Sequence, residues 1–480
     1  MYRKLMPVII SFTLILSLTA CSGANGNNNR TSDAAISLTG EIGGEITISV
    51  YDAMTYKAFL EDAARLFEVK YPGMSVKIEA FTAMPEIKTD GQGMIMADEQ
   101  DDSQDRADYI SRVNTSLMSD GGADILAMDV LPFYKYADSR QLENLEAYMH
   151  TDPEFNKADY RANILNAVKY KNGTWFVPMD YSFNYYAYDS ALLTGGAASG
   201  FGTGGKFTAE ELIALAKPFF DGSSMIFNRL DYASGPRPDM WSLMMEENYT
   251  SFVDIENKTA NFDNGSFENL LESVKRYGEE GLIRSAGKDA TERFFFKPQN
   301  FVNLISLFTR DLGMRMTGMA EGGTMAVGDD DEIAGIEASS DGSVSFTYSQ
   351  AYGINSNSKN KATAWAFIKF LLSEEMQLNM NLRPTVLPIS NSAREKRMET
   401  MLTSMMEQQG QSLNEAHLEA IAKYNEAVNQ LSGQIGAYVI KDIVINDMIA
   451  AEVAYFFDGF KSAAEVANTL QNKVTLYLNE

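Results

Sequence analysis

Carboxylate and tyrosine side chains directly follow two of the strands that the sequence predicts. Tyr51 and Asp52 follow an alternating stretch at 46–50, and Asp129 follows a short apolar run at 124–128 with Tyr134 just beyond it. In open α/β sheets, ligands bind beyond the carboxyl ends of the strands. Carboxylates and phenols placed there can form strong hydrogen bonds with a polar ligand. We therefore expect these residues to line a binding site, with an ordinary core position as the alternative for each tyrosine.

Cys21 is the only cysteine of the chain, and its position indicates a modification site. It follows Arg3, Lys4 and the apolar stretch from Met6 to Ala20. That stretch is too short for a membrane span of about 20 residues and is typical of a secretory signal. The ending Leu-Thr-Ala-Cys resembles the bacterial lipobox, which implies a lipidated Cys21 at the mature N-terminus. The alternative is an ordinary signal peptide with an incidental cysteine.

The residue counts exclude several kinds of chemistry. A single cysteine excludes disulfides within the chain, and lipidation of Cys21 would exclude a cysteine nucleophile or a thiolate metal site. His150 and His417 are the only histidines, which argues against histidine-rich zinc sites and most histidine acid–base catalysis. The acidic run from Asp329 to Glu332 does not match a calcium loop, and we expect it to be a solvated loop. The sequence thus predicts no metal, no cofactor and no catalytic residue.

The net charge of −25 sets further limits. Nucleic-acid binding needs a basic face, so we expect no nucleic-acid partner. Anionic lipid headgroups would repel such a chain, so a membrane attachment would depend on the lipid at Cys21. A length of 480 residues exceeds one typical core and predicts two lobes.

Regular elements surround the candidate residues. Ile46, Ile48 and Val50 alternate with polar residues, the stretch 56–70 has one apolar helical face, and 74–80 alternates again. This pattern predicts a β-α-β unit and hence a parallel sheet. Capping boxes at Thr208/Glu211 and Ser462/Glu465 predict two helix starts.

Several segments together resemble extracellular solute-binding protein family 1, the lipoprotein receptors of bacterial ABC importers. They are 56–73 (YKAFLEDAARLFEVKYPG), 123–148 (ADILAMDVLPFYKYADSRQLENLEAY), 167–192 (AVKYKNGTWFVPMDYSFNYYAYDSAL), 352–375 (YGINSNSKNKATAWAFIKFLLSEE), 387–393 (LPISNSA) and the last helix. The stretch from Phe294 to Gly328 is not a clear match.

The resemblance implies a fold and its division into parts. The fold would be a two-lobed, type II periplasmic-binding-protein-like α/β fold with a hinge and an interlobe cleft. Residues 1–20 would be the signal peptide and 21–44 the lipidated cysteine with a disordered tether. Residues 45–179 plus 350–383 would form the N-terminal lobe, and 183–347 plus 386–480 the C-terminal lobe. Three crossings near 179–183, 345–352 and 383–388 would join them.

The resemblance also adds candidate ligand contacts near the crossings. Asp180, Tyr181, Ser182 and Asn184 follow Pro178 at the first crossing, and Tyr352 and Arg383 lie near the other two. Arg383 could instead form a structural ion pair.

The tryptophans receive opposite predictions. Related sequences often carry a stacking aromatic at the position of Trp241, and Pro236 and Pro238 stiffen the chain before it. We expect its ring to be free to stack on a ligand, with a core tryptophan as the alternative. Trp365 lies within an apolar helical stripe, which predicts a core position.

The resemblance implies a monomeric, lipid-anchored receptor that captures a small solute and delivers it to ABC permease subunits. A carbohydrate is the first candidate for the solute. It would perform no covalent chemistry. One rival is a surface glycosidase or lyase with a carboxylate pair such as Asp129 and Asp180. Another is a ligand sensor or adhesin not coupled to transport. A third keeps the receptor but changes the cargo to a peptide, polyamine or cofactor precursor.

The anchor can be tested directly. Replacing the thiol in Cys21→Ala should prevent lipid modification, so the protein should be released or remain unprocessed. Fractionation of cells and the mass of the N-terminal peptide measure this. A variant that still enters the membrane fraction with a lipid-bearing N-terminus would show that the lipobox interpretation is wrong.

Overall fold

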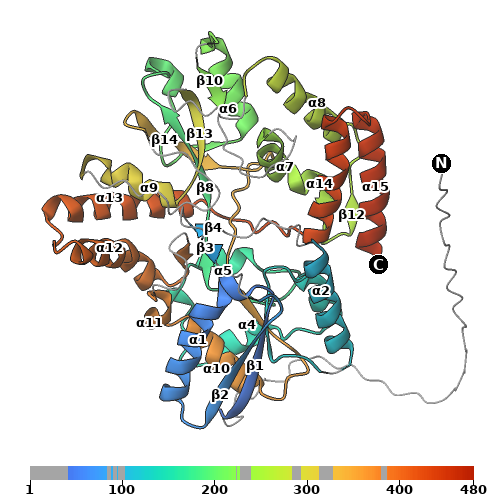
Figure 1. The fold of residues 1–480 in the computed structure, drawn as a ribbon, viewed down its shortest axis with the longest axis vertical. Helices are drawn as coiled ribbons and strands as arrows, with labels where there is room; N and C mark the ends of the chain where they lie inside the picture. Colours follow the sequence, from blue (N-terminus) through green and yellow to red (C-terminus); the bar gives the residue numbers. More distant parts are fainter. Residues whose placement is uncertain are drawn as a thin grey trace, which may run out of the picture. The chain divides into compact units, whose positions relative to one another are not determined.

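The computed structural model describes residues 42–83, 88–89, 94–95, 103–119, 121–222, 224–227, 239–283, 293–312, 328–379 and 386–480. Cys21 and the signal segment therefore lie outside the described residues. Two five-stranded sheets organise this part of the chain, each with its own helices (Figure 1). None of the described helices is long and apolar enough to span a bilayer.

The first sheet is built on the predicted β-α-β unit. Ile46, Ile48 and Val50 are fully buried, which explains the alternation in the sequence. In order, its strands are β2 (Met74–Ala80), β1 (Gly44–Val50), β5 (Ile125–Ala127), β15 (Ala351–Ile354) and β6 (Val177–Pro178). β1 pairs in parallel with β2 and β5, as predicted. The expectation of a parallel sheet is wrong for its far side, because β15 runs antiparallel to β5 and β6 after returning from the second sheet.

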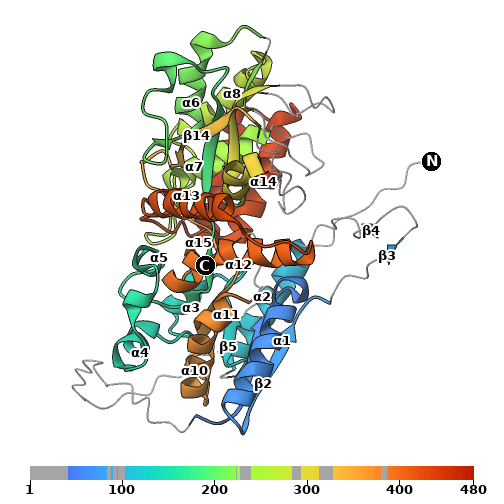
Figure 2. The same cartoon turned by 90° about the vertical axis from the view of Figure 1, so that its left-hand side faces the viewer.

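Helices pack around this sheet. Phe67 of α1 meets Phe367 of α10 edge to face at 5.0 Å, and Figure 2 shows these two helices side by side. The helices that precede or follow its strands in the chain are α1 (Ala53–Lys70), α2 (Ser103–Met118), α3 (Phe133–Asp138), α4 (Leu145–Thr151), α5 (Ala162–Ala167), α10 (Lys361–Leu371) and α11 (Glu374–Gln377), with a 3₁₀ turn η1 (Lys157–Asp159) and a short pair β3 (Lys88–Thr89) and β4 (Met94–Ile95).

The second sheet has β8 at its centre, paired antiparallel with both neighbours. Its strands in order are β10 (Met225–Phe227), β13 (Phe294–Asn300), β8 (Asn184–Asp189), β14 (Asp331–Glu337) and β9 (Lys206–Phe207). Gly335 is required at its position, because a Cβ there would lie 2.6 Å from the carbonyl oxygen of Gly205. The other elements of this stretch are α6 (Ala209–Ala216), α7 (Asp239–Phe252), α8 (Ser266–Glu279), α9 (Val302–Thr309), η2 (Gly195–Ala198), η3 (Lys217–Phe219), η4 (Arg310–Leu312) and the pair β11 (Val253–Asp254) and β12 (Thr259–Ala260).

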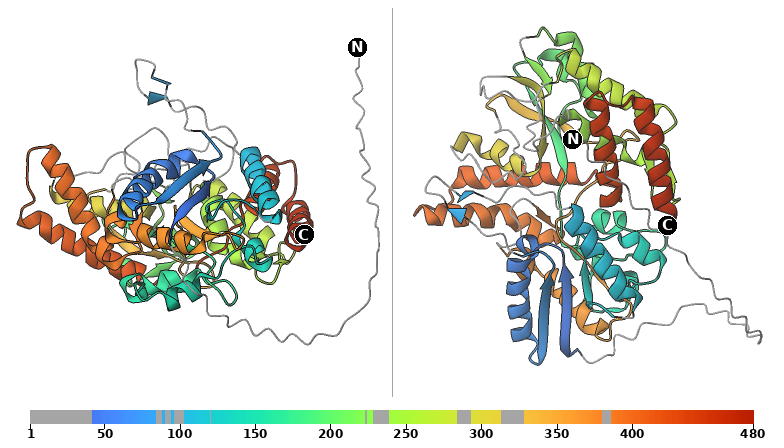
Figure 3. Two further views of the ribbon diagram at one scale, coloured as in Figure 1. Left: turned by 90° about the horizontal axis from the view of Figure 1, so that it is seen from below. Right: turned by 45° about the vertical axis from the view of Figure 1, so that its right-hand side comes forward.

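The C-terminal region is helical. After β16 (Leu387–Pro388) come α12 (Asn391–Gln408), α13 (Glu415–Ser432), α14 (Ile443–Phe457) and α15 (Ala463–Asn479). Helices α14 and α15 lie side by side (Figure 3). Both capping boxes predicted from the sequence are present, at Thr208 with Glu211 before α6 and at Ser462 with Glu465 before α15.

One acidic residue corrects a prediction. The run from Asp329 to Glu332 was expected to be solvated, but Asp331 begins β14 and is only 1% exposed. Its two carboxylate oxygens lie 2.7 and 2.8 Å from Nζ of Lys297 on β13, which is also buried. The ion pair compensates both buried charges, which explains how an acid can occupy this sheet. Asp330 remains near the surface and pairs with Arg293.

Candidate functional site

Three chain segments converge at one junction between the two sheets. The first contains β7 (Asp180–Tyr181), the second contains Thr347 and Ser349, and the third contains β16. β7 pairs with β16, and Ser182 pairs with Thr347. The first two segments connect strands of the two sheets, and the third leads from α11 to α12. The described parts of the crossings proposed near 179–183, 345–352 and 383–388 therefore adjoin one another in space.

The buried side chain of Asp180 links two of these segments by hydrogen bonds. It is fully buried, and its carboxylate accepts hydrogen bonds from the Ser349 N–H at 2.7 Å and the Ser349 hydroxyl at 2.9 Å. Tyr181 is also fully buried. The expectation that Asp180 and Tyr181 touch a ligand is therefore not supported by their positions, whereas Ser182 is half-buried and Asn184 is exposed. A buried Asp180 also cannot serve as the second accessible carboxylate of a glycosidase pair.

Asp129 follows β5 and is exposed, as a ligand-binding carboxylate must be. Burial nevertheless raises the pKa of Asp129 to about 6. Hydrogen bonds from its own N–H and the Val130 N–H, and the nearby Tyr56 hydroxyl, act in the opposite direction. A group that water can reach but that protein surrounds on most sides lies in a recess rather than on a convex surface. Asp129 thus has the accessibility and the environment of a cleft residue.

A pair of stacked tyrosines lies beside Asp129. The ring of Tyr348 stacks on that of Tyr438 at 5.5 Å between centroids with an interplanar angle of 26°, and both residues are half-buried. The Tyr438 hydroxyl donates to the Tyr348 hydroxyl at 3.1 Å, which in turn donates to the Met128 carbonyl at 2.7 Å. Sequence reasoning missed both rings. Tyr348 lies within the second crossing and could have been found there, whereas Tyr438 lies in an irregular segment that no pattern marks.

Two adjoining hollows lie at this junction. The first has an empty volume of about 410 Å³ and is lined by Asp129, Tyr348, Tyr438 and Lys441 among others. The second has about 440 Å³ and is lined by Ser182 and Asn184, by three glutamates and again by Lys441. The shared Lys441 shows that the two hollows are neighbours. Together they bring three accessible members of the predicted set, Asp129, Ser182 and Asn184, to one place.

A buried glutamate, Glu247, lines the second hollow. Glu247 is only 2% exposed. Its burial, and to a smaller extent the negative charge of Glu337, raise the pKa of its carboxyl well above the usual range. Glu247 accepts hydrogen bonds from the Tyr186 hydroxyl at 2.5 Å and the Ala209 N–H at 2.8 Å. These bonds hold Glu247 in the wall of the hollow. Glu246 is more exposed and lies 3.7 Å from Lys441.

Two tyrosines of the predicted set, Tyr51 and Tyr134, are buried, and Tyr134 is part of the lining of the first hollow. Tyr134 is 2% exposed, and its hydroxyl donates to the Asp442 carboxylate at 2.7 Å, which ties α3 to the segment before α14. Tyr51 is also buried, and its ring packs against those of Phe81 and Tyr109 with 6.3 and 5.6 Å between centroids. Asp52 beside it is half-buried and accepts a hydrogen bond from the Met54 N–H, so only Asp52 of this pair keeps an accessible side chain.

Trp241, Tyr352 and Arg383 complete the predicted set. Trp241 is 3% exposed and packs edge to face against Phe267 and Phe457, so its ring is a core element of α7 and the expectation of a free platform is wrong in this structure. Tyr352 is fully buried and donates to the Gln350 side chain, so it too faces the interior. Arg383 lies outside the described residues, as do Pro236 and Pro238.

Known proteins resemble this chain in sequence pattern and fold. The model for the family described as bacterial extracellular solute-binding protein matches residues 100–400. No protein with a curated function matches the chain in sequence. Among solved structures, an ABC substrate-binding protein of Listeria monocytogenes in complex with cycloalternan is 14% identical, with a TM-score of 0.53, and the match covers 91% of this chain and 99% of that one.

Two further structures show the same fold. The GacH receptor of Streptomyces glaucescens, solved unliganded and with acarbose, is 16% identical with a TM-score of 0.52, over 92% of this chain and 100% of that chain. A cyclic alpha-maltosyl-1,6-maltose binding protein of Arthrobacter globiformis is 14% identical with a TM-score of 0.52, over 90% and 98% of the two chains. At these identities the matches establish the two-lobed fold.

The burial of Trp241 gives a measurable expectation. Because its indole fills the core between α7, Phe267 and Phe457, Trp241→Ala should lower the free energy of unfolding by about 3–5 kcal/mol. Denaturant unfolding measures this, with Trp241→Phe as the conservative control that should lose much less. If Trp241→Ala kept native stability but bound ligand more weakly, the core assignment would be wrong and the ring would belong to the ligand site.

Proposed function

Since the chain belongs to the family of bacterial extracellular solute-binding proteins, we propose that its solute is a saccharide, captured between the two lobes and delivered to an ABC importer. The observation that carries the proposal is the meeting of Asp129, the Tyr348–Tyr438 pair, Ser182 and Asn184 at the hollows between the sheets. Aromatic rings stack on the apolar faces of a sugar ring, and charged and amide groups bond its hydroxyl rim.

The ligands of similar structures support a saccharide rather than another solute. The Listeria and Streptomyces proteins are described with cycloalternan and acarbose, and the Arthrobacter protein with a cyclic maltosyl-maltose. The cargo alternatives of peptide, polyamine or cofactor precursor have no comparable support from these neighbours.

We propose that the protein selects its solute and closes its two lobes around it, without covalent chemistry. Asp52, Asp129, Ser182 and Asn184 are the accessible polar contacts, and Tyr348 and Tyr438 supply the rings. The contact residues are held in place by buried side chains, those of Asp180, Tyr181, Tyr134 and Tyr352. A ligand that bridges the lobes stabilises the closed arrangement and shifts the population toward it, by bending at the three crossings. The proposed lobes are 45–179 plus 350–383 and 183–347 plus 386–480.

The location follows partly from the family, whose members are extracellular. We further propose that a lipid on Cys21 holds a monomeric receptor at the outer face of the cell membrane, within reach of the permease. A diacylglyceryl group supplies two acyl chains, which is what stable anchoring needs.

The function is tested by a thermal-shift screen of the purified protein against mono- and oligosaccharides. At 100 times its Kd a saccharide should add about 2.7 kcal/mol to stability. Chromatography of the released ligand should recover it intact. Failure of every saccharide, with stabilisation by peptides or polyamines, would contradict the proposal, and turnover of the bound glycan would favour the enzyme alternative.

The contribution of Asp129 should depend on pH. An ionised carboxylate accepts stronger hydrogen bonds from sugar hydroxyls than a protonated one, so affinity should fall as the pH drops from 7.5 to 5 through the pKa of about 6. Asp129→Asn should bind about tenfold more weakly at pH 7.5, a loss of about 1.4 kcal/mol, and should lose this pH dependence. Calorimetry with the saccharide from the screen measures both effects.

Glu61→Gln is the matched control, because Glu61 is an exposed carboxylate of α1 outside the hollows. It should keep the native affinity and the native pH profile. An Asp129→Asn variant that retains the full pH dependence would place the titrating group elsewhere.

A further inference from the structure

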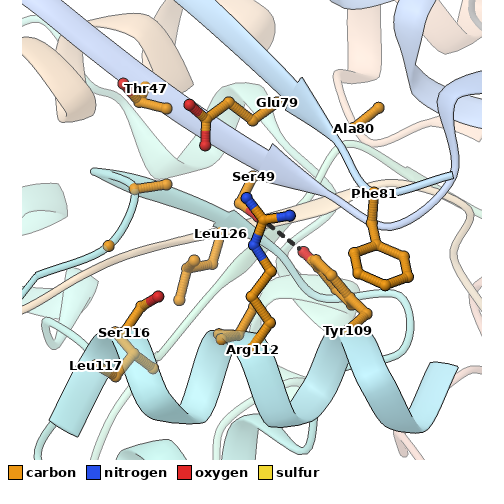
Figure 4. Close-up of a pocket in the computed structure, with 13 residues that line it drawn as sticks. Thr47, Ser49, Glu79, Ala80, Phe81, Tyr109, Arg112, Ser116, Leu117 and Leu126 are labelled. Carbon is orange, nitrogen blue, oxygen red and sulfur yellow. Dashed lines mark hydrogen bonds between the residues drawn. The ribbon is translucent and has the colours of Figure 1, made fainter. Parts of the chain in front are cut away.

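A third hollow lies away from the junction. It has an empty volume of about 710 Å³ and opens between strands β1 and β2 and helix α2 (Figure 4). None of its lining residues belongs to either hollow at the junction. We refer to it as the α2 groove. The proposed function makes no use of it.

Hydroxyl groups line the α2 groove from both sides. Thr47 and Ser49 project from β1, and Ser116 projects from α2 (Figure 4). The Ser49 hydroxyl lies 3.2 Å from the Tyr109 hydroxyl. Such groups both donate and accept hydrogen bonds, so they suit a ligand that itself carries hydroxyls. Leu126 and Val113 supply apolar surface between them.

The charged side chains that line the groove are those of Glu79 and Arg112. The β-sheet register places Lys77 and Glu79 on the same face of the sheet as Thr47 and Ser49. Lys77 forms a 2.6 Å ion pair with Glu79, so these two charges compensate each other. The Arg112 side chain extends from α2 toward the strands (Figure 4), and no acidic side chain of the described residues forms an ion pair with it. A guanidinium that forms no ion pair with a described carboxylate can bind an anion, even in a chain of net charge −25.

One end of the groove carries an aromatic surface. The half-buried Phe81 packs against Tyr109 with 5.5 Å between ring centroids. Figure 4 shows this ring beside the opening, near Ala80. A flat ring next to hydroxyls and one guanidinium can hold the apolar face of a small ring-shaped ligand while its polar groups are bonded.

We propose that the α2 groove is a second binding site, for a small hydroxylated carboxylate of the sugar-acid type. The guanidinium of Arg112 pairs with the carboxylate, and Thr47, Ser49 and Ser116 bond the hydroxyls. One guanidinium neutralises one negative charge, so the groove suits a monoanion better than a ligand of higher negative charge, such as a phosphate ester.

The test is a calorimetric titration of the purified protein with D-glucuronate, with D-glucose as the neutral probe of similar shape. Glucuronate should bind with one equivalent in an Arg112-dependent manner, and Arg112→Gln should weaken it at least tenfold. Ser116→Leu, which fills the groove while keeping the guanidinium, should weaken it as well. D-glucose should show no component that depends on Arg112.

Arg65→Gln is the matched control, since Arg65 is an exposed arginine of α1 that does not line the groove. It should bind glucuronate normally. Absence of saturable glucuronate binding, or binding that survives both Arg112→Gln and Ser116→Leu, would overturn the proposal. Neither result bears on saccharide capture at the junction, because the readout is the dependence on groove residues.

Discussion

The buried carboxylate of Asp180 is the interaction on which the arrangement of the two sheets depends. A buried carboxylate is tolerated only when its oxygens are hydrogen-bonded, and Ser349 satisfies both of them from the neighbouring crossing. Strand pairing of β7 with β16 adds the third crossing to the same junction. The segments that connect the lobes are thereby held together as one unit, and the cleft residues on either side are positioned relative to it.

Hydrogen bonds from tyrosine hydroxyls connect further segments at and around this junction. Tyr56 donates to the Ser349 carbonyl, Tyr348 donates to the Met128 carbonyl, and Tyr134 donates to Asp442. Each bond joins a segment of the first lobe to a crossing or to the C-terminal region. A tyrosine is suited to this role because its ring fills apolar space and its hydroxyl reaches a polar partner at the far end. The same residue type thus supplies both the scaffold and, at Tyr348 and Tyr438, the accessible rings.

Local charge differs from the charge of the whole chain. The protein carries a net charge of −25, yet Lys441 borders both hollows of the junction and Arg112 extends into the α2 groove. Within a recess, the nearest groups dominate the potential, since exposed charges farther away than about 10 Å are largely screened by salt. Binding preferences therefore follow from the few side chains that face each recess.

The sequence by itself determined the elements whose signal is local. Alternation gave β1 and β2, capping boxes gave the starts of α6 and α15, and the apolar stripe around Trp365 correctly predicted a core tryptophan, now 2% exposed. It also placed Asp129, because a residue directly after a strand must lie at the edge of the sheet. The resemblance of six segments, in order, to one family implied the two-lobed fold.

Only the tertiary structure decided which polar and aromatic residues reach solvent. Asp180 and Asn184 lie four positions apart in one crossing, yet one is buried and the other exposed, because only Asp180 meets a partner from another crossing. Trp241 was assigned to the ligand and lies in the core, because its neighbours Phe267 and Phe457 come from distant parts of the chain. The pairing of Tyr348 with Tyr438 has the same origin. Burial is set by contacts between segments far apart in sequence, and no local pattern records them.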